Sequence, residues 1–327
     1  MTNAHSPQLR PPYGASMLLL ALCALAVSAV CAQDYPNRPI RFVTAAAGGG
    51  NDFSARLIAQ GLTERLGQQV VVDNRGGAHV PQNTVAKAAP DGYTILSQNN
   101  TVWIAPLLEK TAYDHIRELA PVTLTARAPN ILVVTPSLPV NSVRDLIAAA
   151  KAAPGEINYA SGVVGSSNFV AAELFKAMAG VNMVRIGYRG TGPALIDVMS
   201  GQVKLMFATA TSSSAHVKAG RLKALAITSA EPSPFAPELP TIAASGVPGY
   251  AAESIYGVWA PAKTPAAILS RLNQEIVKVL TTPQTKDRFF RSGAEVVAST
   301  PQAFAAEIKA EAARLDKVFR SAGISVN

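Results

Sequence analysis

The stretch FVTAAAGGGNDFSARLIAQGL, residues 42–62, decides how this sequence is interpreted. A β-rich run from Ile40 to Thr44 ends in small residues and three consecutive glycines, and an amphipathic segment begins at Asn51 or Asp52. Glycines between a strand and a helix let backbone N–H groups approach an anion closely, at the helix end where the macrodipole favours negative charge. The stretch therefore predicts a strand, an anion-binding loop and a helix, and the anion is a phosphate or a carboxylate.

The same alternation of β-rich runs and helical patterns continues along the chain of 327 residues. We expect strands at residues 40–44, 70–73, 93–97, 131–135, 157–161, 183–188, 203–208 and 222–228. We expect helices at residues 52–66, 82–88, 142–152, 166–179, 193–200, 212–219, 266–280, 283–291 and 301–322. Strands that alternate with helices are typical of βαβ units and of parallel sheets with both faces covered.

Two proline-containing stretches interrupt this alternation. Residues 121–142 contain two adjacent β-rich runs, as expected of a chain that crosses between domains. Residues 231–250 precede another β-rich run, YGVWAPA. Two crossings return the C-terminal segment to the first domain. We therefore expect domain 1 to comprise residues 33–128 and 252–327, and domain 2 to comprise residues 129–251.

The N-terminus, residues 1–32, has the pattern of a secretory signal peptide. A single Arg10 precedes an apolar run from Met17 to Val30, and Val30 and Ala32 suit cleavage after Ala32. The run is shorter than the roughly 20 apolar residues of a membrane-spanning helix. A lipoprotein anchor would use Cys31, but the usual small residue does not precede it. We expect a secreted, periplasmic protein.

Composition and motifs argue against several function classes. Both cysteines, Cys23 and Cys31, precede the expected cleavage site, so the mature chain has no disulfide, thiolate metal site or cysteine nucleophile. The formal charge of +8 suggests nucleic acid or a membrane surface, but the basic residues are scattered singly, so we expect no nucleic-acid partner. The 4 histidines are isolated, with no HExxH or GxSxG motif. We expect no enzyme, cofactor or metal; a base formed by His79 and oriented by Asp52 is the catalytic alternative.

The loops that follow the expected strands are where an open α/β sheet binds ligands. The first, TAAAGGGND, contains neither GxxxxGK[ST] nor GxGxxG, which argues against a nucleotide. The second, YASGVVGSSNF at residues 159–169, again places Gly and Ser between a strand and a helix. Two helix N-termini that face each other across a cleft would hold an anion between them.

Three further loops are expected to line the same cleft, at residues 97–101, 188–194 and 207–214. They offer small, neutral hydrogen-bonding groups. Such groups bind a ligand through the direction of their hydrogen bonds and dipoles more than through net charge. Arg127 and Arg189 are expected near this cleft. Each either grips a carboxylate in a bidentate manner or pairs with an acidic residue at the surface.

These motifs together resemble those of the Bug family, the extracytoplasmic solute receptors of tripartite tricarboxylate transporters. The resemblance is in YPNRPIRFVTAAAGGGNDFSARLIAQGLTERLGQQVVVDNRGGA, AKAAPDGYTILSQNN, NYASGVVGSSNFVAAELFKAMAG, YRGTGPALIDVMSGQVKLMFAT and VKAGRLKALAITSAEPSP. It implies a type II periplasmic-binding-protein fold, in which two doubly wound α/β domains are joined by a hinge and enclose an interdomain cleft. It also implies that the first strand-to-helix loop of each domain holds a ligand carboxylate.

The resemblance implies a particular set of ligand-binding residues. The first jaw of the cleft comprises Ala46, Ala47, Gly48, Gly49, Gly50, Asn51 and Asp52. The second jaw comprises Ser161, Gly162, Gly165, Ser166 and Ser167. The neighbouring loops contribute Asn99, Thr101, Tyr188, Gly190, Thr191, Ala208 and Thr209.

The sequence departs from the family at three of these places. Residues 45–47 are alanines where members usually carry a bulky Pro or Phe, which leaves a roomier jaw. GAHVPQNTVA stands where many read GAGGNIGA, which places His79 near the cleft. Ala208 stands where some relatives have an Asp able to meet a ligand amino group, which argues against an amino-acid ligand.

We therefore expect a monomeric solute-binding protein that captures a small carboxylate-bearing organic acid and presents it to a membrane permease. A signalling receptor that docks on a sensor kinase ectodomain is one alternative, and a hydrolase or transferase on the same scaffold is another. Dicarboxylates, aromatic acids and nicotinate-like compounds fit the loops equally well.

Overall fold

The computed structural model describes residues 35–77, 79–321 and 323–324. From Arg38 onward the chain forms one compact unit, which is the subject of all that follows. The expected signal peptide, its cleavage site and both cysteines lie outside the described residues. None of the described helices combines the length and the apolar character needed to span a bilayer.

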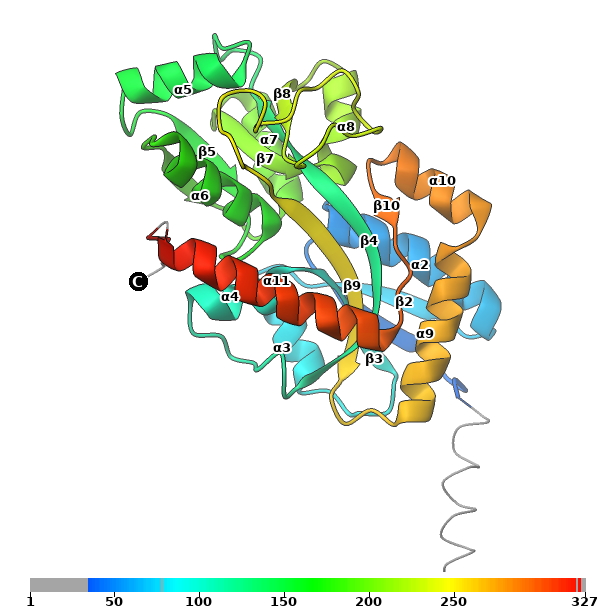
Figure 1. Ribbon diagram of the computed structural model, residues 1–327. Helices are drawn as coiled ribbons and strands as arrows, with labels where there is room; N and C mark the ends of the chain where they lie inside the picture. Colours follow the sequence, from blue (N-terminus) through cyan, green and yellow to red (C-terminus); the bar gives the residue numbers. More distant parts are fainter. Residues whose placement is uncertain (1–34, 78, 322, 325–327) are drawn as a thin grey trace, which may run out of the picture. The chain divides into compact units, whose positions relative to one another are not determined.

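Strands and helices alternate through most of this unit (Figure 1). The strands are β1 (Ile40–Thr44), β2 (Val70–Asn74), β3 (Thr94–Asn99), β4 (Leu119–Val134), β5 (Asn158–Ser161), β6 (Val184–Gly187), β7 (Leu205–Thr209), β8 (Lys223–Ile227), β9 (Glu253–Pro261) and β10 (Glu295–Val296). The helices are α2 (Gly50–Leu66), α3 (Val80–Ala86), α4 (Thr101–Leu108), α5 (Val143–Ala152), α6 (Ser167–Ala179), α7 (Thr191–Ser200), α8 (Ala210–Lys218), α9 (Ala266–Leu280), α10 (Pro283–Arg291) and α11 (Pro301–Ser321).

One sheet connects all the strands, in the order β2-β1-β3-β9-β4-β7-β5-β6, with β8 and β10 also paired to β4. In the first half, β1 lies parallel to β2 and β3. In the second half, β5 lies parallel to β6 and β7 in the same relative order. Each half therefore has the doubly wound arrangement in which the first strand lies between the second and the third. The expected parallel pairings form within each half, whereas the crossing strands β4 and β9 run antiparallel to their neighbours.

The crossing between the halves is one continuous strand of 16 residues, β4, and not two adjacent runs. It pairs with β9 from Leu119 to Pro129 and then with β7 and β8 from Asn130 to Val134. Figure 1 shows β4 and β9 running side by side along this paired segment. The register of the β4–β9 pair shifts next to Pro121, at an irregularity where a residue without an N–H group is tolerated.

The short helix α4 was not expected from the sequence. Its residues are nearly all apolar, so it lacks the polar face by which a surface helix is recognised. It is buried in the core of the first half, where Trp103 lies 6.1 Å from Trp259 of β9, measured between ring centroids. Phe304 of α11 lies 4.9 Å from Trp259. This aromatic cluster fixes the start of α4 relative to the crossing strands.

Candidate functional site

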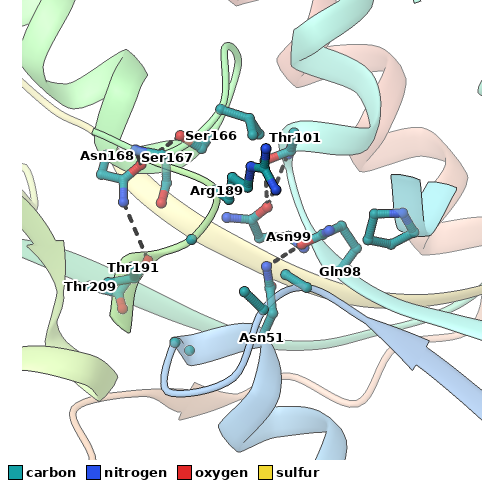
Figure 2. Close-up of a pocket in the computed structure, with 18 of the residues that line it drawn as sticks. Asn51, Gln98, Asn99, Thr101, Ser166, Ser167, Asn168, Arg189, Thr191 and Thr209 are labelled. Carbon is teal, nitrogen blue, oxygen red and sulfur yellow. Dashed lines mark hydrogen bonds between the residues drawn. The ribbon is translucent and has the colours of Figure 1, made fainter. Parts of the chain in front are cut away.

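A cavity of about 610 Å³, counting its opening to solvent, lies where loops of both halves meet, and we call it the central cavity (Figure 2). The central cavity is lined by Ala45, Ala46, Gly49, Gly50, Asn51, Arg75, Gly77, His79, Pro81, Gln82, Gln98, Asn99, Thr101, Gly162, Val163, Ser166, Ser167, Asn168, Arg189, Gly190, Thr191, Thr209 and Tyr256.

Five helices, α2, α3, α6, α7 and α8, begin at this cavity. Their N-cap residues Gly49, His79, Ser166, Gly190 and Thr209 all line it, and none accepts a side-chain capping hydrogen bond from its own helix. Helices α5 and α10, which begin elsewhere, are capped by Ser and Thr side chains, whereas α9 follows a proline and is uncapped. The first N–H groups of a helix have no partner within it, and here several such groups converge on one space. The cavity therefore offers hydrogen-bond donors and positive dipole ends to an anion.

The first jaw is held in shape by Asp52, which does not itself line the cavity. Its carboxylate accepts hydrogen bonds from the Gly48 N–H at 3.1 Å and from Asn74 Nδ2 at 2.8 Å, and Arg56 lies 2.9 Å away. Burial alone would raise the pKa of Asp52, but the hydrogen bonds from Asn74, Arg56 and Gly48 together outweigh it and keep the pKa below its usual value. Asp52 is an anchor for the glycine loop.

The second jaw is held by Asn168, which the sequence did not reveal as a site residue. Its Oδ1 accepts from the Gly162 N–H at 3.1 Å and from Ser166 Oγ at 2.5 Å. Its Nδ2 donates to Thr191 Oγ1 at 3.5 Å, across to the loop that begins α7 (Figure 2). One side chain therefore joins two of the loops that line the central cavity.

The predicted site residues divide into those that line the cavity and those behind it. The lining residues are Ala46, Gly49, Gly50, Asn51, Asn99, Thr101, Gly162, Ser166, Ser167, Gly190, Thr191 and Thr209. The residues that do not line it are Ala47, Gly48, Asp52, Ser161, Gly165, Tyr188 and Ala208.

Four of the residues behind the cavity make contacts elsewhere in the fold. Ser161 Oγ accepts from Arg185 at 2.7 Å, and the Tyr188 hydroxyl donates to Asp197 at 2.6 Å. Gly165 packs against the backbone of α4, and Ala208 is fully buried in the core of the second half.

Five further polar residues line the cavity although they are not in the predicted set of ligand-binding residues, namely Arg75, Gln82, Gln98, Asn168 and Tyr256. Gln98 accepts a short hydrogen bond from Asn51 Nδ2 and so joins β3 to the first jaw (Figure 2). Tyr256 comes from β9, and its hydroxyl lies so close to Gly50 that a Cβ at that position would collide with it. The position of Gln98 at the cavity could be predicted from the sequence, because it precedes Asn99 in the expected loop. The position of Tyr256 could not, because Tyr256 is more than two hundred residues from the jaw that it touches.

The charged side chains around the cavity favour an anion. Within the described part of the chain, none of the lining residues is Asp or Glu, while Arg75 and Arg189 both line the space. Arg75 pairs with Asp73 at 3.0 Å, and the Arg189 side chain makes no hydrogen bond or ion pair with any described residue. Arg127 pairs with Glu307 at 2.7 Å and does not line the cavity. Of the two arginines considered from the sequence, only Arg189 is placed to meet a ligand.

The catalytic alternative is not formed in this structure. His79 Nε2 lies 2.5 Å from Glu109 Oε1, and the Asp52 carboxylate is occupied by Gly48, Asn74 and Arg56. No group of three or more His, Cys, Asp or Glu side chains able to hold a metal ion occurs among residues 35–77, 79–321 and 323–324.

The two halves touch at the rim of the cavity. The Gly77 N–H donates to the Arg189 carbonyl at 3.4 Å. A Cβ added at Gly190 would lie 2.6 Å from the Ala46 Cβ, and one added at Gly192 would lie 2.8 Å from the Ala47 carbonyl oxygen. The loop that begins α7 therefore packs against the first jaw through glycines.

Two α/β halves joined by crossing strands, with helix N-termini around a cavity between them, define the solute-binding class of the type II periplasmic-binding fold. The sequence model of the family described as tripartite tricarboxylate transporter family receptor matches residues 54–324 of this chain. This chain belongs to that family, and the resemblance to the Bug receptors is confirmed.

Individual relatives agree with this assignment. The chain is 35% identical to BugT of Bordetella pertussis over 300 residues, which cover 90% of this chain and 92% of BugT. The structure of R. palustris Rpa4515 with adipate has a TM-score of 0.86 and 37% identity, and the match covers 89% of this chain and 99% of Rpa4515. MatC of Rhodopseudomonas palustris, solved with bound malate, has a TM-score of 0.84 and 28% identity, over 87% of this chain and 99% of MatC.

Proposed function

We propose that this protein captures a small organic acid in the central cavity and delivers it to a membrane permease of the tripartite tricarboxylate type. The observation that supports this most directly is the meeting of five uncapped helix N-termini in a space with no acidic lining residue among those described. Backbone N–H groups fixed in this way can replace the water around one carboxylate. The relatives solved with adipate and malate, both carboxylates, support the same ligand class.

The proposed mechanism is closure of two domains on the ligand. We assign residues 33–128 and 252–327 to one domain and residues 129–251 to the other, with β4 and β9 as the hinge between them. The proposed ligand-binding residues are the members of the predicted set that line the central cavity, to which we add Gln98, Asn168, Arg189 and Tyr256 because they line the same space. Solute binding by closure requires no catalytic group.

The cellular setting follows from the N-terminal pattern and from the family. We propose that the chain is secreted, that the signal peptide is removed near Ala32, and that the mature protein acts as a monomer in the periplasm. No feature of the structure favours a sensor kinase over a permease as the partner.

A thermal-shift panel tests the ligand class. The chain from Gln33 onward is heated with aliphatic mono-, di- and tricarboxylates, with aromatic acids, and with the uncharged amide of each acid. A ligand at about 100 times its Kd adds about 2.7 kcal/mol of stability, enough to raise Tm by several degrees. We expect a shift with one class of acid that disappears with the amide. Equal shifts with acid and amide, or no shift with any acid, would contradict carboxylate capture.

A further inference from the structure

Arg185 is a half-buried cation that lies behind the second jaw and has no role in the site described so far. It belongs to β6, which follows β5 at the end of the sheet, and it does not line the central cavity. Its register partner on β5 is Tyr159, two residues before Ser161, at which the strand ends. The long side chain therefore reaches the loop of the second jaw from outside the cavity.

Three contacts fix the Arg185 guanidinium against this loop. Nε donates to Ser161 Oγ at 2.7 Å, and Nη2 donates to the Gly162 carbonyl at 2.9 Å. The guanidinium carbon lies 4.9 Å from the centroid of the Phe169 ring, in the first turn of α6, where the face of the ring attracts a cation. One side chain thus joins the end of β5, the jaw loop and the start of α6.

The contact with Gly162 concerns the surface that the jaw offers to a ligand. Gly162 lines the central cavity, and a carbonyl oxygen with its partial negative charge would repel an anion there. The Gly162 carbonyl is instead bound by Arg185, and the Gly162 N–H donates to Asn168 Oδ1 at 3.1 Å. Both backbone groups of Gly162 are fixed in this way. The orientation of the loop at the start of α6 is therefore fixed as well.

The charge of Arg185 is not neutralised by a direct partner. A guanidinium remains protonated at any ordinary pH, and the two hydrogen-bond acceptors of Arg185 are both neutral. Arg185 forms no ion pair with any described acidic residue. Glu109 lines the same surface groove, but its carboxylate is hydrogen-bonded to His79. A partly buried charge is only partly screened by salt, so Arg185 adds to the attraction of the α6 N-terminus for an anion.

We propose that Arg185 is a positioning residue for ligand capture. It acts through Gly162 and the start of α6, by holding the carbonyl of the jaw loop and by placing a positive charge behind the loop. This inference rests on the proposed function, because it assigns the ligand anion to the central cavity.

Calorimetric titration with adipate and with malate tests the proposal; if neither binds, the acid with the largest thermal shift in the panel replaces them. We expect Arg185→Gln, which loses the charge and the paired donors, to bind about tenfold more weakly than the wild type. Arg185→Lys keeps the charge but not the planar pair of donors, and we expect it to bind about threefold more weakly. Arg144→Gln removes an exposed arginine of α5 and is the matched control, with unchanged affinity.

The salt dependence of binding distinguishes this role from a purely structural one. Raising the salt concentration from about 50 mM to about 500 mM should weaken binding by the wild type, because it screens the attraction between Arg185 and the anion. We expect a smaller loss in Arg185→Gln and the wild-type loss in Arg185→Lys. The lysine variant keeps the test decisive if Arg185→Gln folds poorly.

The outcomes separate this inference from the function on which it rests. If Arg185→Gln and Arg185→Lys unfold more easily but bind acid with wild-type affinity, Arg185 only stabilises the fold, and carboxylate capture stands. The same conclusion follows if Arg185→Gln and the wild type have equal salt dependence. A wild type that binds neither adipate nor malate, nor any acid of the thermal-shift panel, would overturn both.

Discussion

Glu311 is a buried carboxyl group that lies beside the start of α4. It lies on α11 and is 9% exposed, and its Oε2 has no hydrogen-bond partner among the described residues. Its charged neighbours are Arg314 at 3.8 Å, Glu307 and Arg127. It also lies close to Asn100, the N-cap of α4, which directly follows the lining residue Asn99.

Burial raises the pKa of Glu311 to about 7, and Arg314 only partly offsets this. Because the pKa in the folded protein lies above the unfolded value of 4.5, the stability contributed by this group is fully present below about pH 4.5. It is lost as the pH rises through about 7. Wild-type stability should therefore decline over this window, by up to about 3 kcal/mol.

The substitution Glu311→Gln should remove this decline, because glutamine remains neutral and similar in size. We expect the variant to be more stable than the wild type at about pH 8 and to differ much less at about pH 5. Urea denaturation at a series of pH values measures the difference. Glu64→Gln, at an exposed position of α2, is the matched control and should follow the wild type. An unchanged pH dependence in Glu311→Gln would show that this carboxyl titrates normally.

At the scale of elements, the helices divide by the way their N-termini are satisfied. The Ser142 side chain caps α5 by accepting from the Asp145 N–H at 3.1 Å, and Thr282 caps α10 by accepting from the Thr285 N–H at 3.2 Å. Such caps contribute about 1 kcal/mol each. Helices α2, α6, α7 and α8 lack a side-chain cap and begin at the central cavity. In α6 the Phe169 N–H donates to Asn168 Oδ1 at 3.1 Å, and the N–H groups of these first turns that lack a protein partner are free to donate to a ligand.

This difference predicts a pattern of hydrogen exchange. A bound carboxylate should slow deuterium uptake in the first turns of α2, α6, α7 and α8, because its oxygens accept from their N–H groups. The first turns of α5 and α10 should exchange at the same rate with and without ligand. Mass spectrometry of peptic peptides resolves these segments. Equal protection of all six helices would indicate general stiffening of the protein and would count against ligand capping.

At the scale of the whole molecule, glycines determine how closely the halves approach. Gly192 lies in the first turn of α7, and an added Cβ would lie 2.8 Å from the Ala47 carbonyl oxygen of the opposite jaw. Gly190 meets Ala46 in the same way. Larger side chains at these positions would push the loop that begins α7 away from the first jaw.

The substitution Gly192→Ala should weaken both stability and ligand binding. Alanine in a helix is up to about 1 kcal/mol more favourable than glycine, but the added methyl group would lie 2.8 Å from the Ala47 carbonyl oxygen in the ligand-free structure. Because this crowding costs about 1 to 3 kcal/mol, we expect the variant to lose up to about 2 kcal/mol of stability and to bind ligand about tenfold more weakly. Urea denaturation and calorimetric titration measure the two effects. Ser200→Ala, at the far end of α7, should change neither, and full ligand affinity in Gly192→Ala would show that closure does not require this contact.

The sequence by itself determined the kind of element in most segments and the two jaw loops. Hydrophobic periodicity, glycine runs and short polar loops are local properties, and the residues of 42–62 form the predicted strand, loop and helix. The family follows from the same motifs in their order along the chain. The sequence also predicted an anionic ligand, because a helix N-terminus next to glycines has a fixed polarity.

Only the tertiary structure decided which side chains face the central cavity. Tyr256 reaches Gly50 because β9 returns to the first half of the sheet, and His79 meets Glu109 because the start of α3 lies against the end of α4. The same packing places Asp52 behind the residues that line the cavity, although Asp52 belongs to the motif from which the first jaw was predicted. Contacts between residues distant in the sequence depend on strand register and on how the helices pack. Neither is encoded in any short segment, because each is fixed by the sum of contacts across the core.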